Sequence, residues 1–154
     1  MIEIKQHSIV IPVNTKLGTK YMRIDGTNYT NEDRFLVLID LAKIKNTTLY
    51  FKDYFEKNPL DSCIFYEHEH MKLQIENCIN SFKKSEENPI PVSEVSYYSK
   101  ELRFINGVTR YSWLIAADAE YIPVECRKHD FQELFDDYGY ILFTPKSVKK
   151  MLGI

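Results

Sequence analysis

A continuous apolar run at Phe35–Asp40, with the sequence Phe-Leu-Val-Leu-Ile-Asp, constrains the fold of this chain more than any other segment. Six residues are too few to cross a bilayer, since a membrane-spanning helix needs about 20 apolar residues. This pattern is typical of a strand that is buried on both faces. In such a strand successive residues are all apolar, because no face is exposed to solvent. The run therefore predicts a strand in the interior of a small sheet.

Further strands are predicted where apolar residues recur at every second position or where short apolar runs are bounded by turn residues. One of these segments contains Pro123, which lacks an N–H, so that strand is expected at a sheet edge or at its own start. The predicted strands are Ile2–Ile4, Ile9–Val13, Tyr21–Asp25, Val92–Tyr98, Glu101–Ile105, Tyr121–Cys126 and Tyr140–Phe143.

Helices are predicted where apolar residues recur every three to four positions. The clearest case is Met71–Lys84, whose apolar residues fall at i, i+4, i+7, i+8 and i+11. For a last helix through Met151, Thr144 is the expected N-cap and Pro145 the first residue. The other predicted helices are Leu49–Lys57, Val108–Asp118 and Phe131–Tyr138, the last broken by Gly139. Strands interleaved with helices over 154 residues predict one α+β domain.

Composition narrows the class of protein. The net charge is −2, with 20 Lys and Arg against 22 Asp and Glu, which does not favour a protein that coats nucleic acid nonspecifically. Three cysteines, an odd number without paired metal-ligand spacing, predict buried thiols in a reducing cytosol. No export signal and no apolar run of 18 residues is present, so a cytoplasmic protein without a membrane span is expected.

Chemistry is most plausible at the junction Asn106–Arg110, where a predicted strand ends and a helix begins. Gly107 allows a positive φ and a close approach of the backbone to a ligand. The first turn of a helix presents unpaired N–H groups and a positive dipole end, which together favour an anion. Thr109 adds a hydroxyl group and Arg110 a guanidinium suited to phosphate. The bland alternative is an ordinary capping turn with a solvated arginine.

The surrounding sequence resembles a known family. The run 102–124 resembles the signature segment of the ParB/sulfiredoxin-like fold, in which a strand leads to a Gly-x-x-Arg turn, a helix and a strand carrying Ile-Pro-Val. It is most similar to the plasmid fertility inhibition factors, whose corresponding run is of the type Phe-Thr-Asn-Gly-Arg-His-Arg-Phe-Ala-Trp-Leu. Looser similarity elsewhere implies a single domain over residues 1–154, with its core at about 20–139. The matching residues are Phe104, Asn106, Gly107, Arg110, Trp113, Leu114, Pro123 and Val124.

The departures from the resemblance narrow the chemistry. Sulfiredoxins place a nucleophilic Cys and a His before the arginine, where this chain has Val108 and Thr109, so sulfinic acid reductase chemistry is excluded here. The missing His also removes an acid–base group found in nuclease-like relatives. ParB partition proteins carry a Gly-Glu-Arg-Arg turn and a helix-turn-helix domain, and neither is present. The groups expected to bind phosphate are retained: Gly107, Thr109, Arg110 and the start of the helix.

The resemblance implies a factor that blocks conjugative DNA transfer inside the donor cell. The expected ligands are the phosphates of DNA, or of ATP or another nucleotide with Mg²⁺, and ATP-linked DNase activity is one expected activity. Arg110 is the first candidate catalytic residue, and Asp40 and Glu94 are candidates for positioning metal or water. Arg23 is a candidate second phosphate contact. The full set of candidate ligand-binding residues is Asn106, Gly107, Thr109, Arg110, Tyr111 and Arg23.

Alternatives remain open from the sequence, including a toxin-immunity or purely structural protein. A non-catalytic inhibitor would dock on a protein of the transfer apparatus or act as an anti-defence module. The Glu67–His70 segment, Glu-His-Glu-His, is a metal-binding candidate, although a solvated loop is the expected structure. Lys146, Lys149 and Lys150 are expected to complement the end of the last helix rather than to bind DNA.

Overall fold

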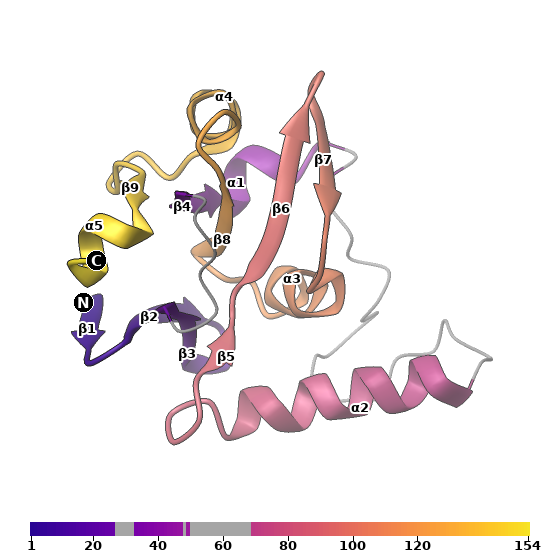
Figure 1. The fold of residues 1–154 in the computed structure, drawn as a ribbon. Coiled ribbons are helices and arrows are strands. Elements are labelled where there is room, and N and C mark those ends of the chain that lie inside the picture. The colour runs from indigo at the N-terminus through magenta and orange to yellow at the C-terminus, as the bar shows by residue number, and fades with distance from the viewer. Residues whose placement is uncertain (27–32, 48, 50–68) are drawn as a thin grey trace.

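The computed structural model describes residues 1–26, 33–47, 49 and 69–154. These residues form both strands and helices, with runs of consecutive strands between the helices, as expected for an α+β protein (Figure 1). The elements in chain order are β1 (Glu3–Lys5), β2 (Ser8–Thr15), β3 (Gly18–Asp25), β4 (Arg34–Asp40), α1 (Leu41–Ile44), α2 (Glu69–Lys83), β5 (Ile90–Pro91), β6 (Ser93–Tyr98), β7 (Glu101–Phe104), α3 (Val108–Ala116), β8 (Tyr121–Arg127), α4 (Phe131–Tyr138), β9 (Lys146–Ser147) and α5 (Val148–Leu152).

The strands form two sheets rather than one. The first has the order β1-β2-β3-β5 and the second the order β7-β6-β8-β4-β9. In the second sheet β4 runs antiparallel to β8, and β8 runs parallel to β6 at Val124 and Glu125. Both sheets are mixed, because β5 also pairs in parallel with β3. The predicted α+β fold with mixed pairing is confirmed, although its strands are divided between two sheets.

The apolar run Phe35–Asp40 lies in an interior strand, as predicted. Residues 36–39 of β4 are all buried, which accounts for the absence of polar alternation. The β2–β3 hairpin pairs Ile9 with Ile24 and Ile11 with Met22, and all four side chains lie in the same core as β4. The core therefore extends over both sheets.

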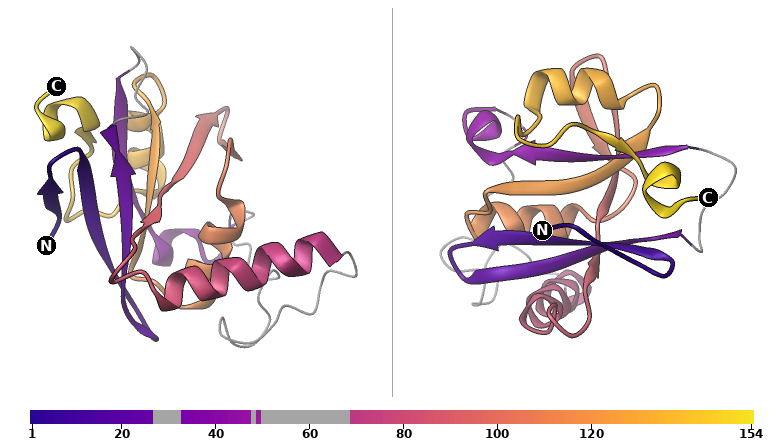
Figure 2. Two further views of the ribbon diagram at one scale, coloured as in Figure 1. Left: turned by 60° about the horizontal axis from the view of Figure 1, so that its bottom comes forward. Right: turned by 90° about the vertical axis from the view of Figure 1, so that its left-hand side faces the viewer.

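After β4 the chain returns to the first sheet at β5, and it passes to the second sheet again within residues 90–94. Ile90 and Pro91 pair with β3, and Ser93 and Glu94 pair with β8, so one short segment joins the two sheets. The amide of Val92 donates to the carbonyl oxygen of Arg23 at 3.0 Å. Figure 2 shows this crossing, in which β5 leads from the edge of β3 into β6. The connection brings residues of both sheets close together.

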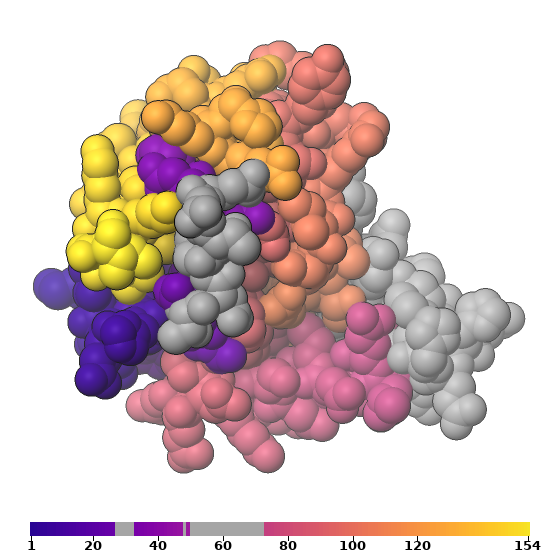
Figure 3. Space-filling model, viewed as in Figure 1, coloured from indigo at the N-terminus to yellow at the C-terminus, as the bar shows by residue number. Residues whose placement is uncertain are grey.

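Helix α2 lies outside the two sheets and packs against α3 and β3 (Figure 1). Its buried residues Ile75, Cys78, Ile79 and Phe82 follow the predicted period, and the Phe82 ring stacks on Trp113 with centroids 3.9 Å apart. In the space-filling view, the N-terminal strands and the C-terminal segment form adjoining surfaces on one side of the molecule (Figure 3). No helix in the described part of the chain is long and apolar enough to cross a membrane.

The segment Tyr140–Phe143 is not a strand, contrary to our prediction. The amide of Phe143 donates to the carbonyl oxygen of Tyr140 at 3.1 Å, so the chain turns there, and Ile141 and Leu142 are exposed. The position beside Phe35 and Leu36 of β4 is taken by β9 instead. Because Lys146 and Ser147 are extended in this pairing, the last helix starts at Val148 and its N-cap is Ser147 rather than Thr144.

Two further expectations differ from the structure. Pro123 lies within β8, an interior strand, rather than at an edge or a strand start. The pairing with β6 covers only Val124 and Glu125, so a residue without an N–H is accommodated one position earlier. The first predicted strand was expected to bury the face that carries Ile4, but Ile4 is exposed. The predicted helix Leu49–Lys57 lies outside the described residues except for Leu49.

Candidate functional site

The Asn106–Arg110 junction forms the predicted turn into a helix. Gly107 is the N-cap of α3 with a φ of 79°, and its carbonyl oxygen accepts a hydrogen bond from the Ser93 hydroxyl group at 2.8 Å. A Cβ at position 107 would lie 2.5 Å from Ser93 Oγ and 2.7 Å from Arg110 Nη2. Glycine is therefore required both for the left-handed backbone and for the space that Arg110 occupies.

Arg110 extends from α3 to the segment that joins the two sheets. Its Nη1 donates to the carbonyl oxygen of Pro91 at 2.8 Å and its Nη2 to Asn106 Oδ1 at 3.4 Å. Burial lowers the pKa of the Arg110 guanidinium, and the nearby charge of Arg23 lowers it further. Within the described residues Arg110 contacts neutral acceptors and makes no ion pair. A bound anion would supply the missing opposite charge.

A cavity of about 360 Å³ opens beside the start of α3, and we call it the cradle. Its wall on the side of α3 consists of Gly107, Val108, Thr109 and Arg110, and its opposite wall comes from α2. No acidic residue lines it among those that the structure describes, and the first-turn amides of α3 add the positive end of a helix dipole. The residues of α2 and β5 that line it are Gln74, Asn77, Cys78, Ser81, Ile90 and Pro91.

A second cavity, of about 400 Å³, lies on the other side of Pro91 and Arg110, and we call it the arginine cavity. Both cavities are lined by these two residues, so they adjoin around the Arg110 guanidinium. The arginine cavity combines cations and anions from both sheets. Its charged and amide residues are Arg23, Asp25, Arg34, Glu94, Asn106, Arg110 and Glu125.

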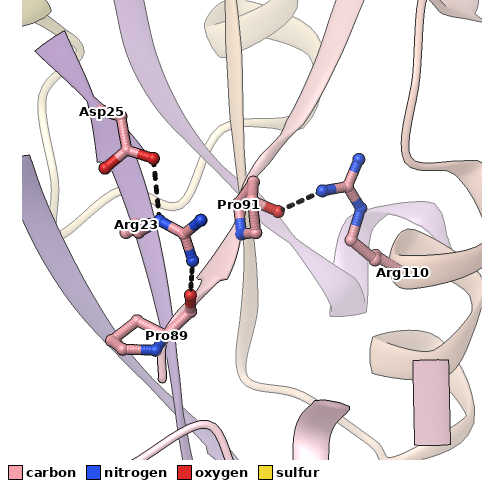
Figure 4. Close-up of polar contacts among 5 residues, drawn as sticks. All are labelled: Arg23, Asp25, Pro89, Pro91 and Arg110. Carbon is pink, nitrogen blue, oxygen red and sulfur yellow. Dashed lines mark hydrogen bonds and ion pairs between the residues drawn. The ribbon is translucent and has the colours of Figure 1, made fainter. Parts of the chain in front are cut away.

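Arg23 reaches the same connecting segment from the opposite side to Arg110. Its Nη1 donates to the carbonyl oxygen of Pro89, and its Nε lies 2.8 Å from Asp25 Oδ2. Figure 4 shows Arg23 and Arg110 on either side of Pro91. The structure therefore brings the predicted second phosphate contact to the same site as Arg110, although the two are 87 positions apart in the sequence.

Glu94 also lies at the site, at the start of β6. Its carboxylate forms an ion pair with Arg34 Nη2 and accepts from Asn106 Nδ2 at 3.3 Å. Its backbone amide donates to Asn106 Oδ1 at 3.0 Å. The Asn106 side chain thus holds the turn against β6. The sequence did not indicate this positioning role. Both carboxylate oxygens of Glu94 are engaged by protein groups.

Two predicted site residues lie elsewhere. Asp40 is at the opposite end of β4 from Arg34, roughly 20 Å away at about 3.3 Å per residue, and its carboxylate caps α1 by accepting from the amide of Ala42 at 3.0 Å. Tyr111 lines neither cavity. It is fully buried, and its hydroxyl group donates to the carbonyl oxygen of Leu49 at 2.9 Å. In the structure Asp40 thus caps α1 and Tyr111 lies in the core, and neither lines the two cavities.

The remaining candidates have simple outcomes. Cys78 and Cys126 are buried free thiols, as predicted, and burial raises the pKa of each to about 12. Cys63 and the first half of Glu67–His70 lie outside the described residues, and Glu69 and His70 begin α2. In the part of the chain that is described, no group of three or more His, Cys, Asp or Glu side chains is arranged to hold a metal ion.

The fold and the site together define a small α+β protein in which a Gly-x-x-Arg turn lies beside two cavities. The family model "Plasmid Fertility inhibition factor" matches residues 36–139, which is more than half of the 154 residues. The chain belongs to the plasmid fertility inhibition factor family, as the resemblance implied.

One solved structure gives a significant match. It is the crystal structure of Oncogenic Suppression Activity Protein, a plasmid fertility inhibition factor, as a gold(I) cyanide derivative. The TM-score is 0.66 at 18% sequence identity, covering 99% of this chain and 81% of that chain, so this likeness concerns the fold. No curated protein matches the chain. The relation to the wider ParB/sulfiredoxin-like fold stays a prediction.

Proposed function

We propose that this protein blocks conjugative DNA transfer and that its cradle binds the phosphate of a nucleotide or of DNA. The observation that carries the proposal is the position of Arg110. Its guanidinium is partly buried at the start of α3, without a carboxylate partner in the described part of the chain, and it borders a cavity without acidic residues. A phosphate can accept hydrogen bonds from this planar group and from the first-turn amides together.

The cradle fits ATP or another nucleotide on chemical grounds. Thr109, which lines the cradle, supplies a hydroxyl group beside Arg110. The described residues contain no metal-binding cluster and those that line the cradle include no carboxylate, so Mg²⁺ would enter with the nucleotide, held by its phosphates and by water.

Isothermal titration calorimetry with ATP and CTP, each with and without Mg²⁺, tests the proposal. The variant Arg110→Ala should weaken binding roughly 10- to 100-fold, because a hydrogen bond to a charged group contributes about 1.5–3 kcal/mol. Arg103→Ala is the matched control, since Arg103 is an exposed arginine on β7 that pairs with Glu101. In donor cells, wild type and the control should reduce plasmid transfer and Arg110→Ala should not. Absence of any nucleotide or DNA binding by the folded protein would refute the proposal.

ATP-linked DNA cleavage is the finer part of this proposal, and Glu94 is the carboxylate at the site that would position water or Mg²⁺. Plasmid DNA incubated with the protein, ATP and Mg²⁺ provides the test. If Glu94 is catalytic, Glu94→Gln should lose cleavage and retain nucleotide binding. Intact DNA with the folded wild-type protein would remove the nuclease activity from the proposal and leave binding.

A non-catalytic inhibitor that docks on a protein of the transfer apparatus is the second candidate. It is favoured by the engagement of both Glu94 carboxylate oxygens, by Arg34 and Asn106. It is also favoured by Val108 and Thr109, which stand where sulfiredoxins have a nucleophilic Cys and a His. The transfer assay separates the two candidates. If the protein is a docking inhibitor that needs no ligand, its folded Arg110→Ala variant should still block plasmid transfer.

A further inference from the structure

A third cavity, open and of about 520 Å³, lies between the outer strands of the two sheets, and we call it the edge groove. One of its lining residues comes from β1, and most of the others come from β9 and α5. Figure 1 shows β1 beside α5, on the side of the molecule where both ends of the chain lie. The groove shares no lining residue with the cradle or the arginine cavity. It is lined by Ile4, Phe35, Pro145, Lys146, Ser147, Lys150 and Met151.

The two strands that border the edge groove are the outermost strands of their sheets. In the described part of the chain, β1 ends the order β1-β2-β3-β5 and β9 ends the order β7-β6-β8-β4-β9. The outer edge of such a strand carries backbone N–H and C=O groups that pair with no neighbouring strand, and an extended peptide can pair with them. The groove therefore favours an occupant with an extended backbone.

The edge groove presents apolar surface to water. Ile4 is 57% exposed, although isoleucine is among the most apolar side chains. Because side chains alternate along a strand, Ile4 lies on the groove face of β1, whereas Glu3 and Lys5 share the other face and pair with each other at 3.8 Å. Phe35 and Met151, which also line the groove, are half-buried. A large apolar side chain bound here would remove this surface from water.

The charge of the edge groove is positive. Lys146 and Lys150 line it and are exposed, and none of its described lining residues is acidic. Lys146 Nζ lies 5.7 Å from the centre of the Phe143 ring, and neither lysine has a carboxylate partner among the described residues. Lys150 is in the last turn of α5, as we expected, but Lys146 precedes that helix in β9 and does not complement its end. Carboxylates on a bound partner would complement both charges.

We propose that the edge groove binds an extended segment of another protein that carries both large apolar side chains and carboxylates. Its apolar side chains pack on Ile4, Phe35 and Met151, and its carboxylates pair with Lys146 and Lys150. Its backbone pairs with the free edge of β1 or β9. This inference goes beyond the proposed function and does not depend on phosphate binding in the cradle.

Selection from a phage-displayed library of random peptides on the immobilised wild-type chain tests the proposal. The enriched peptides should combine Leu, Ile or Phe with Asp or Glu. Each enriched peptide is then synthesised with a fluorescein label, and its dissociation constant is measured by fluorescence anisotropy. A selection that enriches no peptide, or only peptides without acidic residues, would overturn the inference.

The double variant Lys146→Glu and Lys150→Glu tests the charges. It should bind the enriched peptides roughly tenfold more weakly, because two exposed ion pairs become two repulsions. Added NaCl should weaken binding to the wild type, since exposed charges are screened. The control, Lys16→Glu with Lys128→Glu, makes the same change in net charge at exposed positions outside the groove. An equal loss in both double variants would contradict a role for the groove lysines.

Ile4→Ser tests the apolar wall, with Leu73→Ser on α2 as its matched control, because Ile4 and Leu73 are both 57% exposed. Neither substitution opens a cavity in the core, so both variants should unfold in urea close to the wild type. Ile4→Ser should bind the enriched peptides roughly tenfold more weakly and Leu73→Ser should bind them as the wild type does. Unchanged affinity in Ile4→Ser would overturn the inference.

Two other occupants of the edge groove are tested in parallel. A dimer in sedimentation equilibrium that dissociates in Ile4→Ser would assign the groove to a second copy of the chain. Sedimentation with phosphatidylglycerol vesicles that is lost in the groove lysine variant would assign it to an anionic membrane surface. Either result would overturn the inference. All of these variants should bind ATP as the wild type does, so a failure here is distinguishable from a failure of the proposed function.

Discussion

The guanidinium of Arg110 lies directly over Gly107, so close that a Cβ on Gly107 would be 2.7 Å from Nη2 and 3.0 Å from Nε. The glycine of the Gly-x-x-Arg turn thus makes room for the arginine three positions later, in addition to allowing the left-handed backbone. The two residues act together, because the conformation of Gly107 starts the helix that carries Arg110.

Replacing Gly107 should therefore affect both stability and binding. Gly107→Ala places a side chain in the left-handed region, which costs about 1–3 kcal/mol, and also drives its Cβ against Ser93 and Arg110. Gly18→Ala is a matched control, because Gly18 has a φ of 97° and a Cβ there would have nothing within 4 Å. Urea unfolding should show a larger loss for Gly107→Ala than for Gly18→Ala, and only the former should weaken ATP binding. Equal losses would show that Arg110 does not need this space.

Tyr111 should contribute to stability and not to ligand binding. Tyr111→Phe removes the hydrogen bond to the carbonyl oxygen of Leu49 and should lower the free energy of unfolding by about 1 kcal/mol. Tyr98→Phe, at an exposed position, should leave it unchanged. Denaturant unfolding and calorimetry with ATP measure the two effects. A loss of ATP affinity in Tyr111→Phe would contradict the buried position of this residue.

The start of the last helix can be tested at two positions. Ser147 Oγ accepts from the amide of Lys150 at 3.3 Å and donates to Asp33 Oδ1 at 2.6 Å. Ser147→Ala should therefore cost about 1 kcal/mol, a usual value for an N-cap. Thr144→Ala should be close to neutral in the same thermal or urea unfolding experiment. The reverse order of effects would support the N-cap predicted from sequence.

Asp137 should make stability depend on acidic pH. The hydroxyl group of Tyr97 donates to Asp137 Oδ2 at 2.6 Å, and Lys100 Nζ lies 2.9 Å from the same oxygen. These contacts, the Tyr97 bond first, lower the pKa of Asp137 below its ordinary value of 3.8. A lowered folded-state pKa gives stability that is present above the ordinary value and is lost as the pH falls toward the folded-state value.

Asp137→Asn should accordingly be less stable than the wild type at pH 7, and the difference should shrink below about pH 4. Asp136→Asn, an exposed change one position earlier in α4, serves as the control. Urea unfolding at several pH values between about 7 and 3 measures the effect. A difference that stays constant over this range would mean that the Asp137 charge is not linked to folding.

The spacing of apolar residues within short segments accounts for most of the elements that were predicted correctly. The run at Phe35–Asp40 and the period of Ile75, Cys78, Ile79 and Phe82 each report on a local backbone conformation and its buried face. Where tertiary strand pairing overrides the local pattern, a prediction from that pattern is wrong. The apolar residues Ile141 and Leu142 resemble a strand, but the neighbouring position beside β4 is occupied by Lys146 and Ser147.

The turn at Asn106–Arg110 follows from the local sequence alone, because a strand end, a left-handed glycine and a helix start lie within a few consecutive residues. The distant residues that join this turn depend on long-range pairing. Arg23 and Arg34 come from different strands and meet Arg110 where the chain crosses from one sheet to the other, whereas Asp40 is carried to the far end of its own strand. A strand separates its two ends by several ångströms per residue, and sheet pairing between remote segments determines which end meets which partner.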